Sequence, residues 1–316
     1  MSLRIAVVCG GPGPEAEVSR ESAAQVRRAL RSRGHRCTVL EVDRELWPAL
    51  QTGRFDCVFV AVHGRFGEDG TVQGICELLG LPYTGSDVLA SALCFDKATA
   101  KRLLAAAGLP TPAWRTVPAV EASPGSIARA LRAAVAELGV PLVVKPRRGG
   151  STIGLSVVRD PDAVLSAHRI AAPYGEVLCE RFVAGTEVTV GILGDNAPRA
   201  LPTLEIISQR PLYDYAAKYT AGQSRHVIPA RLPEAHRAAC QAAALGAHLA
   251  LGCRDVSRVD LIVDGDGTPW VLEVNAIPGL TELSLLPDAA RADGVAFSDV
   301  CQALVDSALR RGGAPL

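Results

Sequence analysis

A short segment near the C-terminal end constrains the fold most, because its pattern predicts a β-hairpin with polar side chains on one face. Two runs rich in Val, Ile, Leu and Trp flank the turn sequence Asp264–Gly267. If the strands pair symmetrically about that turn, Asp260 lies opposite Glu273 and Arg258 lies opposite Asn275. The two-residue spacing along each strand then places all four side chains on the same face.

This polar face has the chemistry of a metal site. Directly opposed residues have Cβ atoms roughly 5 Å apart, so the oxygens of Asp260, Glu273 and Asn275 could ligate Mg²⁺ together. The guanidinium of Arg258 would meet developing negative charge beside them. The alternative is an amphipathic hairpin whose polar face is only solvated.

Length and charge narrow the class of protein. A chain of 316 residues is long enough for two or three domains. Lys plus Arg and Asp plus Glu number 33 each, so bulk charge indicates neither a nucleic-acid nor a membrane partner. The nine cysteines form no metal-binding spacing, and no apolar run suits a signal peptide or a membrane span. We expect a cytoplasmic protein with reduced core cysteines.

The pattern of elements changes along the chain. Residues 1–90 alternate strand and helix, as in a small parallel α/β domain. One helix is predicted over Val88–Ala107, and strands dominate from Val140 onward. The polar segment Ser208–Ser224 has no clear periodicity and contains three of the five tyrosines, which favours a lid loop over a site. A surface Ω-loop without a catalytic role is the alternative.

The N-terminal turn Gly11–Ala16 formally matches the G-x-G-x-x-A fingerprint of nicotinamide-nucleotide sites. An oxidoreductase is therefore one alternative function. Pro12 and Pro14 remove backbone N–H donors from this turn, and Glu15 would place a carboxylate against a pyrophosphate. A ligand ammonium suits Glu15 better.

Three further segments carry candidate binding groups. In Lys145–Gly154, glycines flank small hydroxyls and a lysine ends a strand, which favours phosphate binding over a plain basic hairpin tip. Glu180 and Glu187 bracket a turn beginning at Val183, where strand edges could bind a base and a ribose. His63, at the end of an apolar strand, lies where α/β sheets bind ligands, although a lone histidine is more often structural.

The order and spacing of these motifs resemble the D-alanine:D-alanine ligases of the ATP-grasp superfamily over nearly the whole chain. The resemblance implies an α/β (α+β) fold with a Rossmann-like N-terminal domain at 1–90. It also implies two α+β domains clasping ATP, a central one at 91–184 and a C-terminal one at 185–316 that carries the metal site and lid loop. The matching motifs are Glu15-x-Glu17-Val-Ser19, His63-Gly64, Gly67–Gly74, Leu81–Ser86, Asp96-Lys97, Lys145-Pro146, Gly150-Ser151, Tyr213–Tyr219, Arg258-x-Asp260 and Glu273–Ser284.

For the nucleotide, the resemblance implies that Lys97 and Lys145 hold phosphates, while Glu180, Val183 and Glu187 serve adenine and ribose. It further implies two Mg²⁺ ions, with Mn²⁺ as a possible substitute, held by Asp260, Glu273 and Asn275. The activity implied is ligation of two D-alanine molecules through an acyl phosphate, with release of ADP and phosphate, for peptidoglycan synthesis.

For the amino-acid substrates, the resemblance implies a separate set of groups. Glu15, tied to Ser151 and Tyr219, would meet the ammonium of the first D-alanine, near His63. Arg258 and the Gly279 amide would stabilise the oxyanion. Lys218, Ser284 and Leu285 would hold the second substrate.

The chain departs from the usual family pattern at Arg20, Gly149 and Ala276. These departures weaken the prediction of which second substrate the chain prefers and of how mobile the loop is. Tyr219 favours D-alanine there, but a related ligase that uses D-lactate, D-serine or another D-amino acid is the nearest alternative. A catalytically silent nucleotide-binding protein is a third. Family analogy also implies a homodimer.

Overall fold

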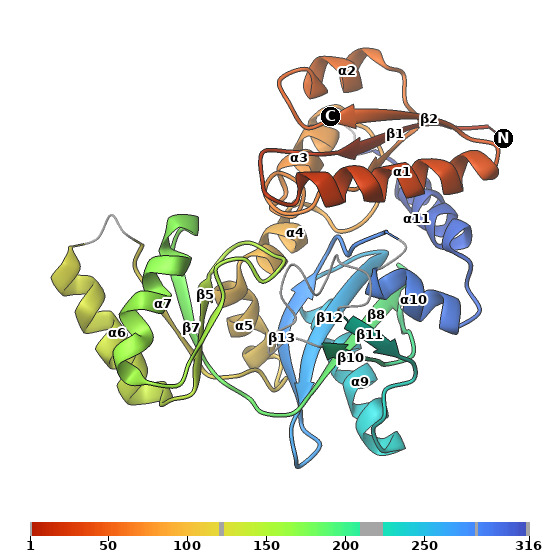
Figure 1. Cartoon of the computed structure of the whole chain (residues 1–316). Coiled ribbons are helices and arrows are strands. Elements are labelled where there is room, and N and C mark those ends of the chain that lie inside the picture. The colour runs from red at the N-terminus through yellow and green to blue at the C-terminus, as the bar shows by residue number, and fades with distance from the viewer. Residues whose placement is uncertain (1, 120–122, 209–223, 282–283, 314–316) are drawn as a thin grey trace.

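The computed structural model describes residues 2–119, 123–208, 224–281 and 284–313, and it is built around three sheets (Figure 1). One sheet is parallel and the other two are antiparallel. The parallel sheet lies at the top of Figure 1, and the two antiparallel sheets lie below it on either side.

The N-terminal sheet has the strand order β2-β1-β3, with all pairs parallel. The β1 run Ile-Ala-Val-Val-Cys is buried on both faces, as expected for the middle strand of a covered parallel sheet. Buried positions of α1 recur every three or four residues, which turns one stripe of the helix toward the sheet. The elements are β1 (Arg4–Cys9), α1 (Ala16–Ser32), β2 (Arg36–Glu41), α2 (Leu46–Thr52), β3 (Cys57–Val60) and α3 (Thr71–Leu78).

The second sheet has four antiparallel strands in the order β4-β7-β5-β6. Helices α6 and α7 close a compact apolar core over this sheet. The elements are β4 (Trp114–Val117), α6 (Pro124–Leu138), β5 (Leu142–Pro146), β6 (Ser156–Val158), the 3₁₀ turns η1 (Pro161–Ala163) and η2 (Ala172–Tyr174), α7 (Val164–Ala171) and β7 (Val177–Arg181).

The third sheet has six strands, with β11-β10-β8-β12-β13 in order and β9 paired to β8. Helix α9 packs along its outer face, so the opposite face is left for the site. The elements are β8 (Thr186–Leu193), β9 (Arg199–Ala200), β10 (Leu204–Ser208), β11 (Ser224–Val227), α9 (Glu234–Ala250), β12 (Val256–Val263) and β13 (Pro269–Asn275).

The helix predicted over Val88–Ala107 is instead two helices, α4 (Val88–Phe95) and α5 (Lys97–Ala106). The break falls at Asp96, whose extended backbone ends α4 while its side chain caps α5 by accepting from Thr99 N at 3.0 Å. A cap of this type satisfies backbone donors that a continuous helix would not leave open. The break places Lys97 at the start of a helix.

The chain returns to the N-terminal sheet at its end. Helices α10 (Leu285–Ala292) and α11 (Phe297–Arg311) share one apolar core with β1, β3 and α1. Figure 1 shows α11 lying close beneath α1. Among the residues that the structure describes, no helix is both long and apolar enough to cross a membrane.

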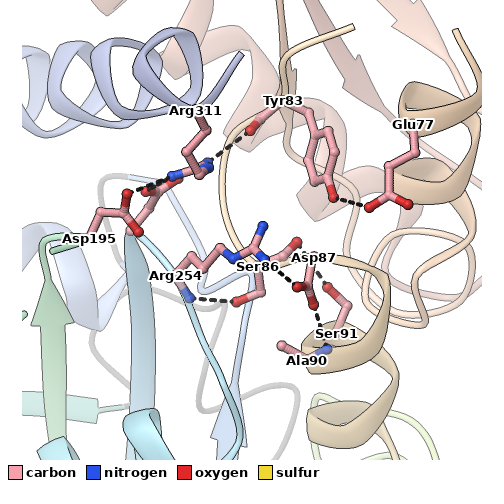
Figure 2. Close-up of polar contacts among 10 residues, drawn as sticks. Glu77, Tyr83, Ser86, Asp87, Ala90, Ser91, Asp195, Arg254 and Arg311 are labelled. Carbon is pink, nitrogen blue, oxygen red and sulfur yellow. Dashed lines mark hydrogen bonds and ion pairs between the residues drawn. The ribbon is translucent and has the colours of Figure 1, made fainter. Parts of the chain in front are cut away.

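A polar network around Arg311 connects the end of α11 to the segments before β12 and after β3 (Figure 2). The Arg311 guanidinium donates to both carboxylate oxygens of Asp255, at 2.5 and 2.8 Å, and to the carbonyl oxygen of Tyr83 at 3.1 Å. It also lies 3.3 Å from Asp195. The Asp255 side chain is 0% exposed and accepts from the Gly85 amide at 2.8 Å. The network therefore joins the first and third sheets through a buried charge.

Replacing Arg311 with methionine is expected to destabilise this junction, because Asp255 would keep a buried charge without its cation. Breaking such a pair costs about 3 kcal/mol, which lowers the thermal midpoint by more than about 5 °C in a chain of this size. Calorimetry or circular dichroism measures the change. Arg310→Met, an exposed neighbour on the same helix, is the matched control, and an equal midpoint for both variants would contradict the role of Arg311.

Candidate active site

The predicted hairpin forms, with Asp260 opposite Glu273 and Arg258 opposite Asn275, as expected. The assumption of symmetric pairing about the turn is wrong, because Val263 pairs with Pro269 and Leu261 with Val271. The shift is a β-bulge that leaves Leu272 as an extra residue of β13. If the ladder continued regularly from the pair Leu261–Val271, Glu273 would lie opposite Val259 and its side chain would point to the other face of the sheet.

The polar face of the hairpin is an ordered charge cluster. Arg258 donates to both oxygens of Asp260, at 2.9 and 2.8 Å, and the Thr189 hydroxyl donates to the same carboxylate at 2.6 Å. Lys97 Nζ lies 3.3 Å from the Glu273 carboxylate. The Asn275 side-chain oxygen accepts from the Ile277 amide at 3.0 Å. Two carboxylates and an amide oxygen therefore share this face with two cations.

This donor set fits Mg²⁺, which prefers oxygen ligands and takes one or two carboxylates together with water and substrate phosphates. No group of three or more His, Cys, Asp or Glu suited to a metal occurs in the described part of the chain. The predicted ligands therefore include two carboxylates, Asp260 and Glu273, and no third such group lies beside them among the described residues. Further ligands would come from a bound nucleotide and water.

A second charge cluster shapes the loop after β5. Asp96 accepts from Arg147 at 2.8 Å and from Arg148 at 3.0 Å. Burial by itself would raise the pKa of Asp96, but hydrogen bonds from Arg147, the Thr99 amide and Arg148 outweigh it and lower the pKa to about 2. The Lys97 ammonium donates to the Gly149 carbonyl oxygen. The start of α5 therefore holds this loop against the hairpin.

An inter-sheet cavity lies between the second and third sheets. It brings together the residues predicted for a nucleotide with two of the predicted metal ligands. Its apolar walls come from both sheets, and acidic and basic groups also line it. It is lined by Lys97, Val143, Lys145, Pro146, Gly149, Gly150, Thr152, Ile153, Leu155, Val157, Glu180, Arg181, Phe182, Val183, Gly185, Glu187, Asp260, Ile262, Leu272 and Glu273.

A junction cavity lies where the N-terminal sheet meets the hairpin and the loop after β5. It brings together those predicted amino-acid-binding residues that the structure describes, which are up to 270 positions apart in the sequence. It is lined by Glu15, His63, Glu68, Cys94, Phe95, Lys97, Gly149, Gly150, Ser151, Arg258, Glu273, Val274, Asn275, Ala276, Gly279, Ser284 and Leu285. Lys97, Gly149, Gly150 and Glu273 line both cavities, so the two meet at these residues.

Glu15 is buried at the rim of the junction cavity and accepts from the Ser151 hydroxyl at 2.5 Å. Two glycines permit this position. A Cβ at Gly64 would lie 2.7 Å from one oxygen of Glu15, and a Cβ at Gly150 would lie 2.9 Å from the other. The predicted tie between Glu15 and Ser151 is therefore present, whereas Tyr219 and Lys218 lie outside the described residues.

His63 is 7% exposed and has two neighbours that the sequence interpretation did not single out. Its Nε2 lies 3.1 Å from the Ser22 hydroxyl, and its Nδ1 lies 3.8 Å from the Glu68 carboxylate. Glu68 lines the junction cavity, and its place inside the Gly67–Gly74 motif was the available signal. Together the two contacts fix the ring at the end of β3.

Gly279 and Ser284 lie close together before α10. A Cβ at Gly279 would lie 2.6 Å from the Ser284 hydroxyl oxygen, which accepts from the Thr281 amide at 3.0 Å. Ser284 is also the N-cap position of α10. The N-terminus of a helix favours a negatively charged group, so this end of the junction cavity suits a carboxylate.

Models of two protein families match the chain. The family described as "D-ala D-ala ligase C-terminus" matches residues 103–306, and the one described as "D-ala D-ala ligase N-terminus" matches residues 47–86. The D-alanine–D-alanine ligase of Pelotomaculum thermopropionicum is 45% identical over 314 residues, which is 99% of each chain. That of Desulforudis audaxviator is 46% identical, over 98% of this chain and 100% of its own.

Solved structures of related ligases also match nearly the whole chain. The D-alanine–D-alanine ligase of Bacillus anthracis complexed with ATP gives a TM-score of 0.83 at 31% identity, over 98% of each chain. The VanG D-Ala:D-Ser ligase of Enterococcus faecalis gives a TM-score of 0.82 at 30% identity, over 98% of this chain and all of that one.

Proposed function

The chain belongs to the D-alanine–D-alanine ligase family, and on that premise we propose how its residues divide the reaction. It is an ATP-dependent ligase with the ATP-grasp fold, and it joins two D-alanine molecules into D-alanyl-D-alanine. The reaction passes through an acyl phosphate and releases ADP and phosphate. The dipeptide serves peptidoglycan synthesis.

The observation that carries the proposal is the meeting of the two cavities at Lys97 and Glu273. The reaction needs a γ-phosphate from one side and a carboxylate from the other at a single point. Holding both reactants in line contributes most of the catalysis in phosphoryl transfer. The inter-sheet cavity suits ATP, and the junction cavity suits the two amino acids.

In the inter-sheet cavity, we assign Glu180, Val183 and Glu187 to adenine and ribose, and Lys145 and Lys97 to phosphates. Asp260, Glu273 and Asn275 would hold Mg²⁺, with Mn²⁺ as a possible substitute. Two such ions would neutralise the phosphate oxygens and keep the γ-phosphate in line for transfer. The family's use of ATP and the hard oxygen donors of the hairpin support these assignments.

In the junction cavity, Glu15 binds the ammonium of the first D-alanine and is oriented by Ser151. The family resemblance adds Tyr219 to this contact. His63 lies beside the carboxylate that is phosphorylated. The amine of the second D-alanine then attacks the acyl carbon and phosphate leaves. Arg258 and the Gly279 amide stabilise the oxyanion of this step, while Ser284 and Leu285 hold the second carboxylate. The family resemblance adds Lys218 to this role.

The location and assembly of the enzyme are also part of the proposal. We place it in the cytoplasm, where ATP and reduced cysteines are available. We propose a homodimer by family analogy. The division into 1–90, 91–184 and 185–316 follows the three sheets, although α11 packs back on the first of them. Light scattering of the purified chain tests the dimer.

The substrate assay measures ADP release with ATP, Mg²⁺ and D-alanine, with D-serine, D-lactate and L-alanine as parallel acceptors and the product identified by mass. We expect dipeptide from D-alanine alone. The likeness to a D-Ala:D-Ser ligase makes D-serine the strongest competing acceptor. ADP release only with D-serine or D-lactate would keep the chemistry and change the product. ADP release with none of them would reject the proposed function.

A further inference from the structure

A buried lysine lies behind the inter-sheet cavity without lining it. Lys101 stands one helical turn after Lys97 on α5 and is 1% exposed. Its ammonium lies 2.7 Å from a carboxylate oxygen of Glu180 and donates to the Thr111 hydroxyl at 2.6 Å and to the Pro112 carbonyl oxygen at 3.0 Å. The Trp114 ring centroid lies 5.3 Å away. Thr111, Pro112 and Trp114 are not among the residues that line the inter-sheet cavity, whereas Glu180 is.

Glu180 is shared by two cations. Its second carboxylate oxygen accepts from Lys145 at 3.2 Å, and its side chain is 3% exposed. Unlike Lys101, both Glu180 and Lys145 line the inter-sheet cavity. One buried carboxylate therefore stands between two ammonium groups, and the trio carries a net charge of +1 when all three are ionised.

We propose that Lys101 is a positioning residue of the nucleotide site, which neutralises Glu180 so that Lys145 can direct its ammonium to nucleotide phosphates. This inference rests on the proposed function, because it takes Lys145 as a phosphate ligand. A buried carboxylate requires a cationic partner. If Lys101 did not supply that charge, Lys145 would be held by Glu180 and would be a poorer ligand for phosphate.

The surrounding contacts hold Lys101 in a fixed position relative to the β12–β13 hairpin, which carries the predicted metal ligands. Thr111, which accepts from Lys101, donates through the same hydroxyl to the Val271 carbonyl oxygen at 2.8 Å. The Val271 amide in turn donates to the Pro110 carbonyl oxygen at 2.8 Å. Val271 is two residues before Glu273 on β13. These hydrogen bonds therefore tie Lys101 to β13, the strand that carries Glu273 and Asn275.

The charge of Lys101 depends on pH in an accessible range. Burial lowers its pKa, the Glu180 carboxylate opposes this change, and repulsion from Lys145 adds to it, giving a pKa of about 8. These two groups face it from β7 and β5, and on its own helix Lys97 is paired with Glu273. Phosphates bound at Lys145 would offset the repulsion and raise the pKa of Lys101. Nucleotide binding near pH 8.5 should then take up a proton, and the affinity should fall as the pH rises above 8.

The first test compares Lys101→Met with Arg102→Met, which removes a charge from the exposed neighbouring position of the same helix. We expect the KM for ATP of Lys101→Met to rise about tenfold at pH 7, the size of one lost hydrogen bond between charged groups. Arg102→Met should keep the wild-type KM. The pH dependence of KM above pH 8 should disappear in Lys101→Met and persist in Arg102→Met. An unchanged KM and pH profile in Lys101→Met would overturn the inference.

The second test uses the wild-type enzyme and does not depend on whether Lys101→Met folds. Calorimetric titration with MgADP at pH 8.5, in two buffers of different ionisation enthalpy, counts the protons taken up. Measurable uptake by the wild type and by Arg102→Met supports the role of Lys101. Binding without proton uptake would reject that role and leave the proposed function intact. Absence of MgADP binding by the wild type would reject both.

Discussion

Replacement of Glu273 by alanine is expected to abolish turnover, with kcat at least about a thousandfold lower, because stabilisation of charge in the transferring phosphoryl group depends on it. Glu273 lies opposite Asp260 on the hairpin, lines both cavities and pairs with Lys97 at 3.3 Å. Its loss removes a proposed metal ligand and leaves Lys97, the proposed phosphate-binding cation, without its ion-pair partner. A higher Mg²⁺ concentration should not restore the rate of ADP release. The measurement is ADP release at saturating ATP and D-alanine over a range of Mg²⁺ concentrations.

Asp266→Ala is the matched control for this experiment. Asp266 is an exposed carboxylate at the tip of the same hairpin, so its removal tests whether any acidic residue of the hairpin supports activity. The control should retain wild-type kinetics. Substantial activity in Glu273→Ala would show that the metal assignment is wrong.

Replacement of Glu15 by glutamine should weaken binding of the first D-alanine by about 30-fold or more, because a buried carboxylate that pairs with an ammonium contributes at least that much. Glutamine keeps the shape and can still accept from the Ser151 hydroxyl, but it lacks the charge. ATP binding should be intact, since Glu15 lines the junction cavity and is absent from the lining of the inter-sheet cavity. The D-alanine dependence of ADP release and a separate ATP titration measure the two sites.

Glu17→Gln removes an exposed charge two residues later, at the start of the same helix, and should leave both sites unchanged. If Glu15→Gln shows wild-type D-alanine kinetics, Glu15 does not bind the ammonium. A parallel loss of ATP affinity would instead indicate that the substitution disturbs the loop around Gly150.

The sequence predicted the pairing of the hairpin where residue chemistry and strand alternation point to the same positions. The opposition of Asp260 to Glu273 followed from the two-residue period and the Asp-Gly turn. The tie between Glu15 and Ser151 followed from the family resemblance, since no local pattern links positions so far apart. Both predictions depend on residue type and order, which the sequence carries directly.

Other features depend on tertiary contacts and were not predictable in the same way. The Leu272 bulge has no local signal, and the symmetric pairing assumed for the hairpin gave the right opposition only because the bulge corrects the register. Helical periodicity continues through Asp96, so the break there became visible only with its partners Arg147 and Arg148. Nothing in the sequence distinguishes Lys101 from an ordinary helix lysine, because its burial is set by Glu180 and Trp114 from other strands.

The Leu272 bulge also makes the hairpin unequally tolerant of insertions and deletions in its gene. A codon gained or lost among the exposed tip residues 265–266 changes only a loop outside the paired register. The loss of a single codon at 272 would remove the bulge and leave a regular ladder that keeps Glu273 opposite Asp260, whereas the loss of the codon at 274 would bring Asn275 opposite Val259 and turn its side chain toward the face covered by α9. An alignment that moves a gap by a few positions in this segment therefore separates a silent length variant from an inactive enzyme.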